Sequence, residues 1–144
     1  CWEEQPILNW EDSMKFGYTI LYVDDVEGAI AFYEKAFGLK RRVIDPTGQY
    51  GELETGETLL AFVSVELAHE NLPSGFRQNR LDELPSGFEI AFICDDVAKA
   101  YEVAVANGAK GFCPPEQKPW GQMVAYVRDP YGILVELASE MPKG

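Results

Sequence analysis

Apolar residues change their spacing along the chain in a fixed order. Residues 16–23 are mostly aromatic and β-branched, which predicts a strand. Over residues 26–37 the apolar positions recur every three or four residues and predict one apolar stripe on a helix. Three further strand-like stretches follow at residues 39–45, 48–54 and 57–65, with turn-forming residues between them. The first half of the chain therefore predicts a βαβββ unit.

The same order occurs again in the second half. Residues 88–94 predict a strand, and the apolar stripe that begins at Val97 predicts a second helix, ended by Asn107 and Gly108. Both predicted helices follow the tripeptide Asp-Asp-Val, whose aspartates are expected to cap them. Further strands are predicted at residues 109–114, 121–128 and 133–138. The sequence thus predicts an α+β fold of two tandem βαβββ modules.

The repeat also predicts the organisation of the chain as one compact domain. Between the modules lies a segment rich in Pro, Ser, Gly, Asn and charged residues, which is expected to be a linker. The expected parts are an N-terminal extension at 1–15, a first module at 16–65, the linker at 66–86 and a second module at 87–140.

Charge and composition narrow the range of partners. The formal net charge is −12, from 24 acidic and 12 basic residues. Such a surface argues against a nucleic-acid partner, since phosphate binding needs a basic face. No apolar run is long enough for a membrane span. The three cysteines form no Cys-x-x-Cys pair, which is typical of reduced thiols and predicts a cytoplasmic protein.

Three segments carry a resemblance to a known family. They read YVDDVEGAIAFYEKAFGL, FEIAFICDDVAKAYEVAVANGAK and PWGQMVAYVRDPYGILVEL. In this order the chain resembles the vicinal oxygen chelate superfamily, which includes glyoxalase I, bleomycin-resistance proteins and extradiol dioxygenases. The resemblance implies a curved mixed sheet around a cleft, with helices on its outer face. It also implies that metal ligands, where present, project inward from the first and last strands of each module.

Strand alternation indicates which residues occupy those family positions. In the second module Glu89 and Glu136 each lie among apolar residues of a strand and are expected on the cleft face. Aligning the two modules puts Tyr18 and Ala61 at the matching positions of the first. Family metal sites usually combine His and Glu, but none of these four is a histidine. The single histidine, His69, lies in the linker and is expected on the surface.

This set of side chains bears on the metal and on the chemistry. Two carboxylates and a tyrosine hydroxyl are poor ligands for Zn, Ni or Fe, although they would hold Mg or Mn weakly. One alternative is a satisfied pair, with Glu136 bound to Arg128, Tyr18 or Tyr126. Another is general acid–base catalysis by one glutamate with a raised pKa. No residue is assigned a catalytic role from the sequence.

Three further residues are expected to line the cleft. Trp120, next to a glycine, suits stacking on a flat ligand, or else packs as a rim residue on the linker or on another subunit. Gln122 and Tyr126 share the strand face that alternation directs to the cleft.

The sequence therefore predicts a small-molecule binding protein that resembles the glyoxalase and bleomycin-resistance proteins. It is expected to be free of metal and to bind an aromatic or cationic ligand in an acidic cleft. The alternative is a metal-dependent lyase, isomerase or dioxygenase that uses Glu89 and Glu136 as ligands. The resemblance also implies a homodimer, since members of that family commonly pair, and exposed sheet edges and the large apolar residues of the N-terminal extension favour it. Those apolar residues are Trp2, Ile7, Leu8 and Trp10.

Overall fold

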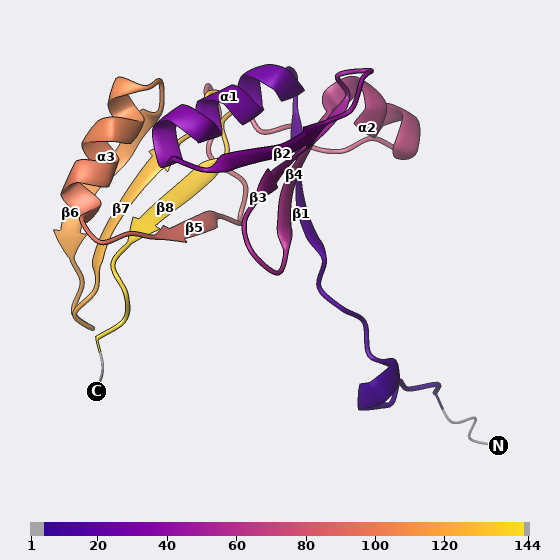
Figure 1. Cartoon of the computed structure of the whole chain (residues 1–144), viewed down its shortest axis with the longest axis horizontal. Coiled ribbons are helices and arrows are strands. Elements are labelled where there is room, and N and C mark those ends of the chain that lie inside the picture. The colour runs from indigo at the N-terminus through magenta and orange to yellow at the C-terminus, as the bar shows by residue number, and fades with distance from the viewer. Residues whose placement is uncertain (1–4, 143–144) are drawn as a thin grey trace.

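Two four-stranded sheets and their covering helices make up the protein (Figure 1). The structure is a computed structural model and describes residues 5–142. The elements of the first half are β1 (Tyr18–Val23), α1 (Val26–Phe37), β2 (Lys40–Ile44), β3 (Tyr50–Glu54) and β4 (Leu59–Ser64). Those of the second half are β5 (Ile90–Ile93), α3 (Val97–Ala106), β6 (Lys110–Gln117), β7 (Met123–Arg128) and β8 (Leu134–Ala138). The predicted α+β fold of two tandem βαβββ modules is confirmed.

The two sheets have the same topology. The strand order is β1-β4-β3-β2 in the first and β5-β8-β7-β6 in the second. In each, the first strand pairs in parallel with the last, and the other pairs are antiparallel. The second module begins its first strand at Ile90, two residues later than the alternation predicts, so Phe88 and Glu89 precede the strand.

The repeated Asp-Asp-Val starts both helices. Asp25 accepts a hydrogen bond from the backbone N–H of Gly28 at 3.0 Å, and Asp96 accepts one from Lys99 at 3.1 Å. In each copy the second aspartate is the cap, and it satisfies one of the N–H groups left free at a helix start. The end of α1 is set by Gly38, whose φ of 70° is a left-handed conformation that other residues adopt only with strain.

Each sheet has one face under a helix and one face turned away from it, called here the inner face. In β1, Leu21 and Val23 are buried against α1, while Tyr18 and Ile20 point to the inner face and are about half exposed. The same alternation buries Val135 and Leu137 of β8. The helices α1 and α3 contact one another across the top of the two sheets (Figure 1). One continuous apolar core therefore joins both modules.

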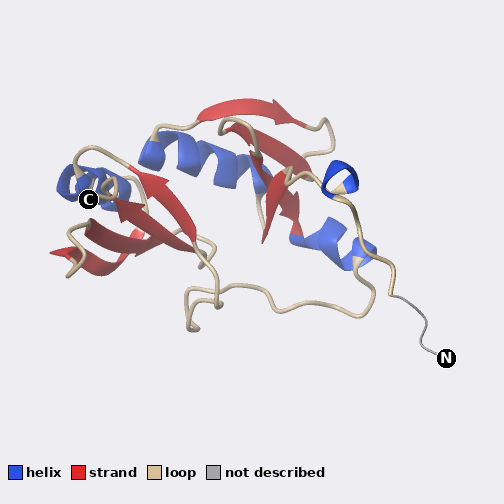
Figure 2. Ribbon diagram, turned by 90° about the horizontal axis from the view of Figure 1, so that it is seen from below, coloured by secondary structure: helices blue, strands red, loops and turns tan. Residues whose placement is uncertain are grey.

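The segment between the modules contains a helix that the sequence pattern did not predict. This helix, α2, spans Val65–Asn71 and is capped by the side chain of Ser64. The chain then continues as a long loop along one side of the molecule, from the first module to the second (Figure 2). No helix between residues 5 and 142 has the length and apolar character needed to cross a membrane.

Arg128 fixes this loop to the second module. Its guanidinium is buried and donates to the carbonyl oxygens of Glu83 at 2.7 Å and Arg80 at 2.9 Å, and to that of Gly132 at 2.7 Å. Gly132 has a φ of 90°, and a side chain there would lie 2.6 Å from the backbone of Arg80. A buried charge is tolerated here because several carbonyl dipoles replace its lost water.

We expect Arg128→Lys to lower the free energy of unfolding by about 2–4 kcal/mol, because an ammonium cannot span the same carbonyl groups. Urea denaturation of both proteins measures the change. Arg77→Lys is the matched control, since Arg77 lies exposed in the same loop. Equal losses in the two variants would show that Arg128 does not anchor the loop.

Candidate functional site

The inner face of the second module brings together three of the sequence-predicted site residues. Glu136 of β8 lies directly between Ala91 of β5 and Tyr126 of β7 in the strand register. Residues paired in register share a sheet face, so the side chains of Glu136, Ala91 and Tyr126 all lie on the inner face. Glu89 precedes Ala91 by two residues and lies on the same side, next to Glu136.

The two glutamates interact directly. Desolvation, a carboxyl–carboxyl hydrogen bond with Glu136 and the charge of Glu136 together raise the pKa of Glu89 to about 7. Two adjacent carboxylates resist double ionisation, so near neutral pH this pair holds one proton for part of the time. In the described part of the chain no lysine or arginine forms an ion pair with either glutamate. The pair is therefore negatively charged but not compensated by a cation.

Tyr126 orients this pair. Its hydroxyl donates a hydrogen bond to Oε1 of Glu136 at 3.0 Å. Desolvation and the neighbouring carboxylates raise the pKa of Tyr126 to about 12, so the hydroxyl stays protonated and remains a donor. Of the three partners expected for Glu136, Tyr126 is the one observed. Arg128 binds the loop carbonyls instead.

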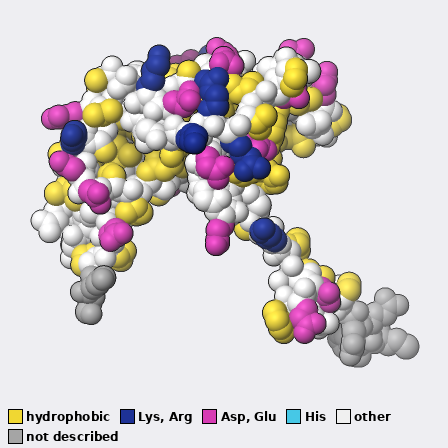
Figure 3. Space-filling model, viewed as in Figure 1, with side chains coloured by type: hydrophobic (Ala, Val, Ile, Leu, Met, Phe, Trp, Pro, Cys, Tyr) yellow, Lys and Arg dark blue, Asp and Glu magenta, His cyan; other side chains and the backbone are white. Residues whose placement is uncertain are grey.

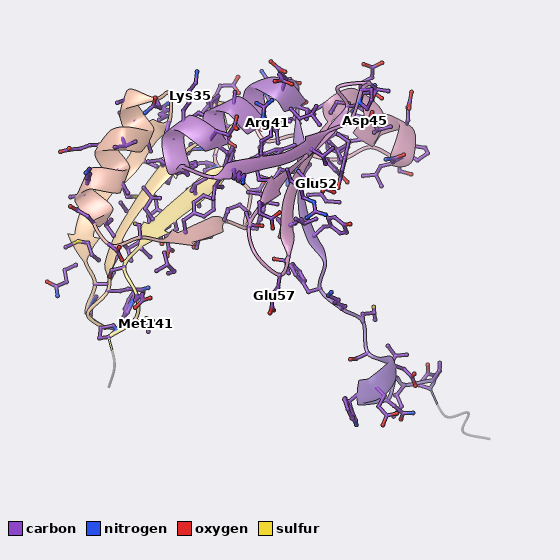
Figure 4. All side chains as sticks on the ribbon, in the orientation of Figure 1. Lys35, Arg41, Asp45, Glu52, Glu57 and Met141 are labelled. Atoms are coloured by element: carbon purple, nitrogen blue, oxygen red, sulfur yellow. The ribbon has the colours of Figure 1, made fainter. Side chains whose placement is uncertain are left out.

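The first module has a carboxylate on its inner face that sequence reasoning missed. Glu52 is 9% exposed, accepts a hydrogen bond from the Tyr50 hydroxyl at 2.7 Å, and pairs with Nε of Arg42 at 3.1 Å. It lies opposite Ala61 in the register, just as Tyr126 lies opposite Glu136 in the second module. The alternation of residues 50–54 contained this signal, because it puts Glu52 on the face of Tyr50. Figure 4 marks Glu52 on the first sheet.

The two remaining family positions lie on the first sheet. Tyr18 is 52% exposed at the start of β1, the free edge of its sheet. Ala61 has no exposed surface and is flanked in the register by Ile20 and Glu52. A ligand would reach Ala61 only after those neighbours moved.

Trp120 and Gln122 lie together, but at the far end of β7. The Trp120 ring N–H donates to Oε1 of Gln122 at 2.8 Å, and the Gln122 amide donates to the carbonyl of Ser139 at 2.8 Å. Gln122 precedes Tyr126 by four residues, which is about 13 Å along a strand. These two residues form a rim beyond the carboxyl pair, and Trp120 is 55% exposed there.

The side chains available as metal ligands decide which metal ions this site would fit. Among residues 5–142, no three His, Cys, Asp or Glu side chains converge where they would hold a metal ion. His69 stacks on Phe76 at 4.5 Å in the linker region. Two carboxylates with no imidazole fit Zn, Ni or Fe poorly, whereas a hard cation would accept them and complete its shell with water.

Comparison with known proteins now decides the family. The model of the Glyoxalase/Bleomycin resistance protein/Dioxygenase superfamily matches residues 15–137. The chain belongs to this superfamily. The vicinal oxygen chelate resemblance predicted from the sequence is thereby confirmed.

Several members of the glyoxalase superfamily are similar over nearly the whole chain. Lactoylglutathione lyase GLX1 of Arabidopsis thaliana is 30% identical over 148 residues, covering 97% of this chain and 50% of that protein. The chain thus spans about half the length of the curated relatives it matches.

Solved structures of the glyoxalase superfamily share the fold. A glyoxalase-related enzyme from Fulvimarina pelagi has a TM-score of 0.78 and 23% identity, covering 92% of this chain and 94% of that one. A lactoylglutathione lyase from Agrobacterium tumefaciens has a TM-score of 0.64 and 24% identity, covering 88% of this chain and 94% of that one.

The raised pKa of Glu89 predicts how stability depends on pH. Its folded-state value of about 7 lies above the ordinary 4.5, so ionisation opposes folding. The stabilisation is complete below pH 4.5 and is lost as the pH rises through 7. We expect Glu89→Gln to melt at a higher temperature than the wild type at pH 8, and the two to melt alike at pH 4.5.

Thermal melts across this pH range measure the difference between variant and wild type. Glu57→Gln is the matched control, because Glu57 is exposed in the β3–β4 turn and points away from the sheets (Figure 4). A difference in melting temperature between wild type and Glu89→Gln that stays the same at every pH would contradict the raised pKa of Glu89.

Proposed function

We propose that the protein binds a small aromatic cation on the inner face of its second module, without a metal. The observation that carries this proposal is the neighbouring pair Glu89 and Glu136, which lacks a compensating cation among the described residues, so that Glu89 holds a proton for part of the time near neutral pH. A positively charged ligand group would take the place of that proton. It would relieve the repulsion between the two carboxylates and so bind more strongly than to either carboxylate alone.

The surroundings of the pair support an aromatic or apolar body on such a ligand. A cavity of about 300 Å³ opens between the edges of β1 and β5; Ala91, whose register partner is Glu136, lines it from the inner face, whereas Ile90 and Phe92 line it from the helix-covered face. Most of its other lining side chains are apolar or threonine, including Leu59 and Thr19. This volume is at the lower end of the range for small-molecule sites. On the other side of Ala91, Ile93 adds an exposed apolar surface.

Tyr126 would contribute selectivity to this site. Because its hydroxyl already donates to Oε1 of Glu136, the second oxygen of that carboxylate is left to accept from a ligand. A ligand ammonium or amidinium can donate to it, whereas a ligand carboxylate would be repelled. The acidic net charge of −12 adds a long-range attraction for cations.

Binding of a cationic probe should depend on pH. We expect the affinity for ethidium, a flat aromatic cation, to rise about tenfold between pH 6 and pH 8, because binding needs the ionised pair. Fluorescein, a flat aromatic anion, should not bind. Isothermal titration in two buffers of different ionisation enthalpy should also show proton release near pH 7.

Variants of the pair test the assignment. Glu89→Gln should abolish the proton release and flatten the pH dependence, while Glu136→Gln should weaken ethidium binding by about tenfold or more. Glu57→Gln serves again as the matched control. Metal-free bleomycin is a second probe, chosen because the matching family includes bleomycin-resistance proteins. Equal ethidium binding by Glu136→Gln and wild type would refute the proposed site.

A metal-assisted lyase or isomerase is the second candidate. It is supported by the similarity to the plant protein named lactoylglutathione lyase, which covers 97% of this chain. Glu89 and Glu136 would be the protein's carboxylate ligands to Mg²⁺ or Mn²⁺. In this candidate the metal would polarise substrate oxygens, and Tyr126 would orient the Glu136 ligand.

Titration with Mn²⁺, followed by electron paramagnetic resonance, separates the two candidates. The metal-free proposal predicts a dissociation constant of about 1 mM or weaker, because two carboxylates alone hold a hard cation poorly. The metal-assisted candidate predicts tight stoichiometric binding that Glu136→Gln removes. Tight binding of this kind would overturn the metal-free proposal.

A further inference from the structure

An N-terminal arm, residues 5–16, extends away from the body of the protein (Figure 1). Every residue of the arm is exposed. Three of its large apolar side chains lie close together in sequence, with exposed fractions of 88% for Ile7, 57% for Leu8 and 82% for Trp10. Apolar side chains exposed in such a cluster indicate a surface that a partner covers.

The arm also has a local structure that keeps acidic groups next to the apolar ones. Trp10–Asp12 forms one turn of 3₁₀ helix, and the Ser13 hydroxyl donates to the carbonyl of Trp10 at 2.7 Å. This turn places Glu11 and Asp12 directly beside Trp10. Figure 3 shows hydrophobic and acidic side chains together on the arm.

A surface of matching character lies where the first module meets the second. A hollow of about 490 Å³, called here the helix hollow, opens between the end of α1, β5 and the start of α3. Its lining is mostly apolar and includes Phe37, Leu39 and Phe92. Figure 3 shows hydrophobic side chains gathered there, between the two helices.

The rim of the helix hollow carries positive charge. Lys35 of α1 and Lys99 of α3 line it, and Asp96 is the acidic residue among its lining. Figure 4 marks Lys35 on α1, on the side near α3. Two lysines beside an apolar hollow are notable in a chain with only 12 basic residues against 24 acidic ones. The rim therefore complements an apolar segment that carries acidic residues.

We propose that the arm of one copy binds in the helix hollow of a second copy of this chain. Trp10, Ile7 and Leu8 fill the apolar hollow, and Glu11 and Asp12 contact the two lysines of its rim. The arm leaves β1 on the side of the molecule away from α3 (Figure 1), whereas the hollow lies between α1, β5 and α3, so the contact is made between copies. A two-fold axis lets each copy give one arm and receive one, which closes the assembly as a dimer.

Sedimentation velocity at several protein concentrations tests the proposal. We expect a concentration-dependent dimer for the wild type, with Trp10→Ala weakening its dissociation constant by about 30-fold or more. Leu84→Ala is the matched control, since Leu84 is 88% exposed but lies in the linker loop. A wild type that stays monomeric, or a dimer that Trp10→Ala leaves unchanged, overturns the proposal.

Exchange of charges tests the rim contact separately. The double variant Lys35→Glu/Lys99→Glu reverses the rim charges, and the double variant Glu11→Lys/Asp12→Lys reverses the arm charges. Each double variant should weaken the dimer by about fivefold or more. The protein with all four changes should recover most of the wild-type affinity. Lys110→Glu, an exposed lysine on β6, is the control for a change of net charge. Failure of the four changes to restore affinity overturns the assigned contact.

Covalent trapping distinguishes binding between copies from binding within one. Cys94 lines the helix hollow and is a free thiol. In a background of Cys1→Ser and Cys113→Ser, Leu8→Cys should form a disulfide with Cys94 of a second copy on treatment with diamide. A cross-linked dimer on a non-reducing gel is expected. A disulfide within one chain, or no disulfide, overturns the proposal, and neither result bears on ligand binding at Glu89 and Glu136.

Discussion

The arrangement of the two modules depends on one buried carboxylate, that of Asp129. It lies in the turn between β7 and β8, has no exposed surface, and accepts a hydrogen bond from the hydroxyl of Tyr33 on α1 at 2.7 Å. Its other oxygen accepts from the backbone N–H groups of Tyr131 and Ile133 at 2.8 and 2.9 Å. Burial raises the pKa of Asp129, and these three donors offset part of that cost. A helix of the first module is thereby attached to a turn of the second.

Two features described above rest on that attachment. Tyr33 lies near the end of α1, so its position also sets where Phe37 and Leu39 meet Phe92, which together line the helix hollow. The free edges of β1 and β5 approach one another on either side of the cavity beside Ala91. Tyr131 adds a second contact between modules, because its hydroxyl donates to the carbonyl of Asp25 at 3.2 Å. Cavity and hollow are therefore products of how the modules dock, and neither belongs to one module alone.

Periodicity explains why the fold was predictable. Strand alternation and helix spacing are local signals, and they correctly put Glu136 and Tyr126 on one face and Val135 and Leu137 on the other. Contacts between distant segments leave no such trace. From the sequence alone Asp129 resembles an ordinary turn residue, because its hydrogen bond with Tyr33 joins residues that are distant in the sequence. The helix α2 is short and follows a strand without a break, so no period of its own distinguishes it.

The site was predictable only in part for the same reason. Alternation alone does not say that Glu52 is neutralised by Arg42, since β2 must first pair with β3 to bring them within 3.1 Å. It also does not say that Glu89 lies next to Glu136 and has a raised pKa, because that depends on how closely the segment before β5 approaches β8. Aligning the two modules matched Glu89 with Tyr18 and Glu136 with Ala61. It did not reveal the carboxylate of the first module, because Glu52 lies on the neighbouring strand β3.

A comparison of the two inner faces shows which one is suited to a ligand. Both carry a tyrosine that donates to a glutamate, through Tyr50 and Glu52 in the first module and Tyr126 and Glu136 in the second. In the first module, Arg42 binds Glu52 and also pairs with Glu54 at 3.3 Å, so Glu52 already has a cationic partner. In the second module, the neighbour of Glu136 is another glutamate. The inner face of the first module thus holds an ion pair and that of the second an uncompensated acidic pair, and the uncompensated pair is where a cation from outside gains most by binding.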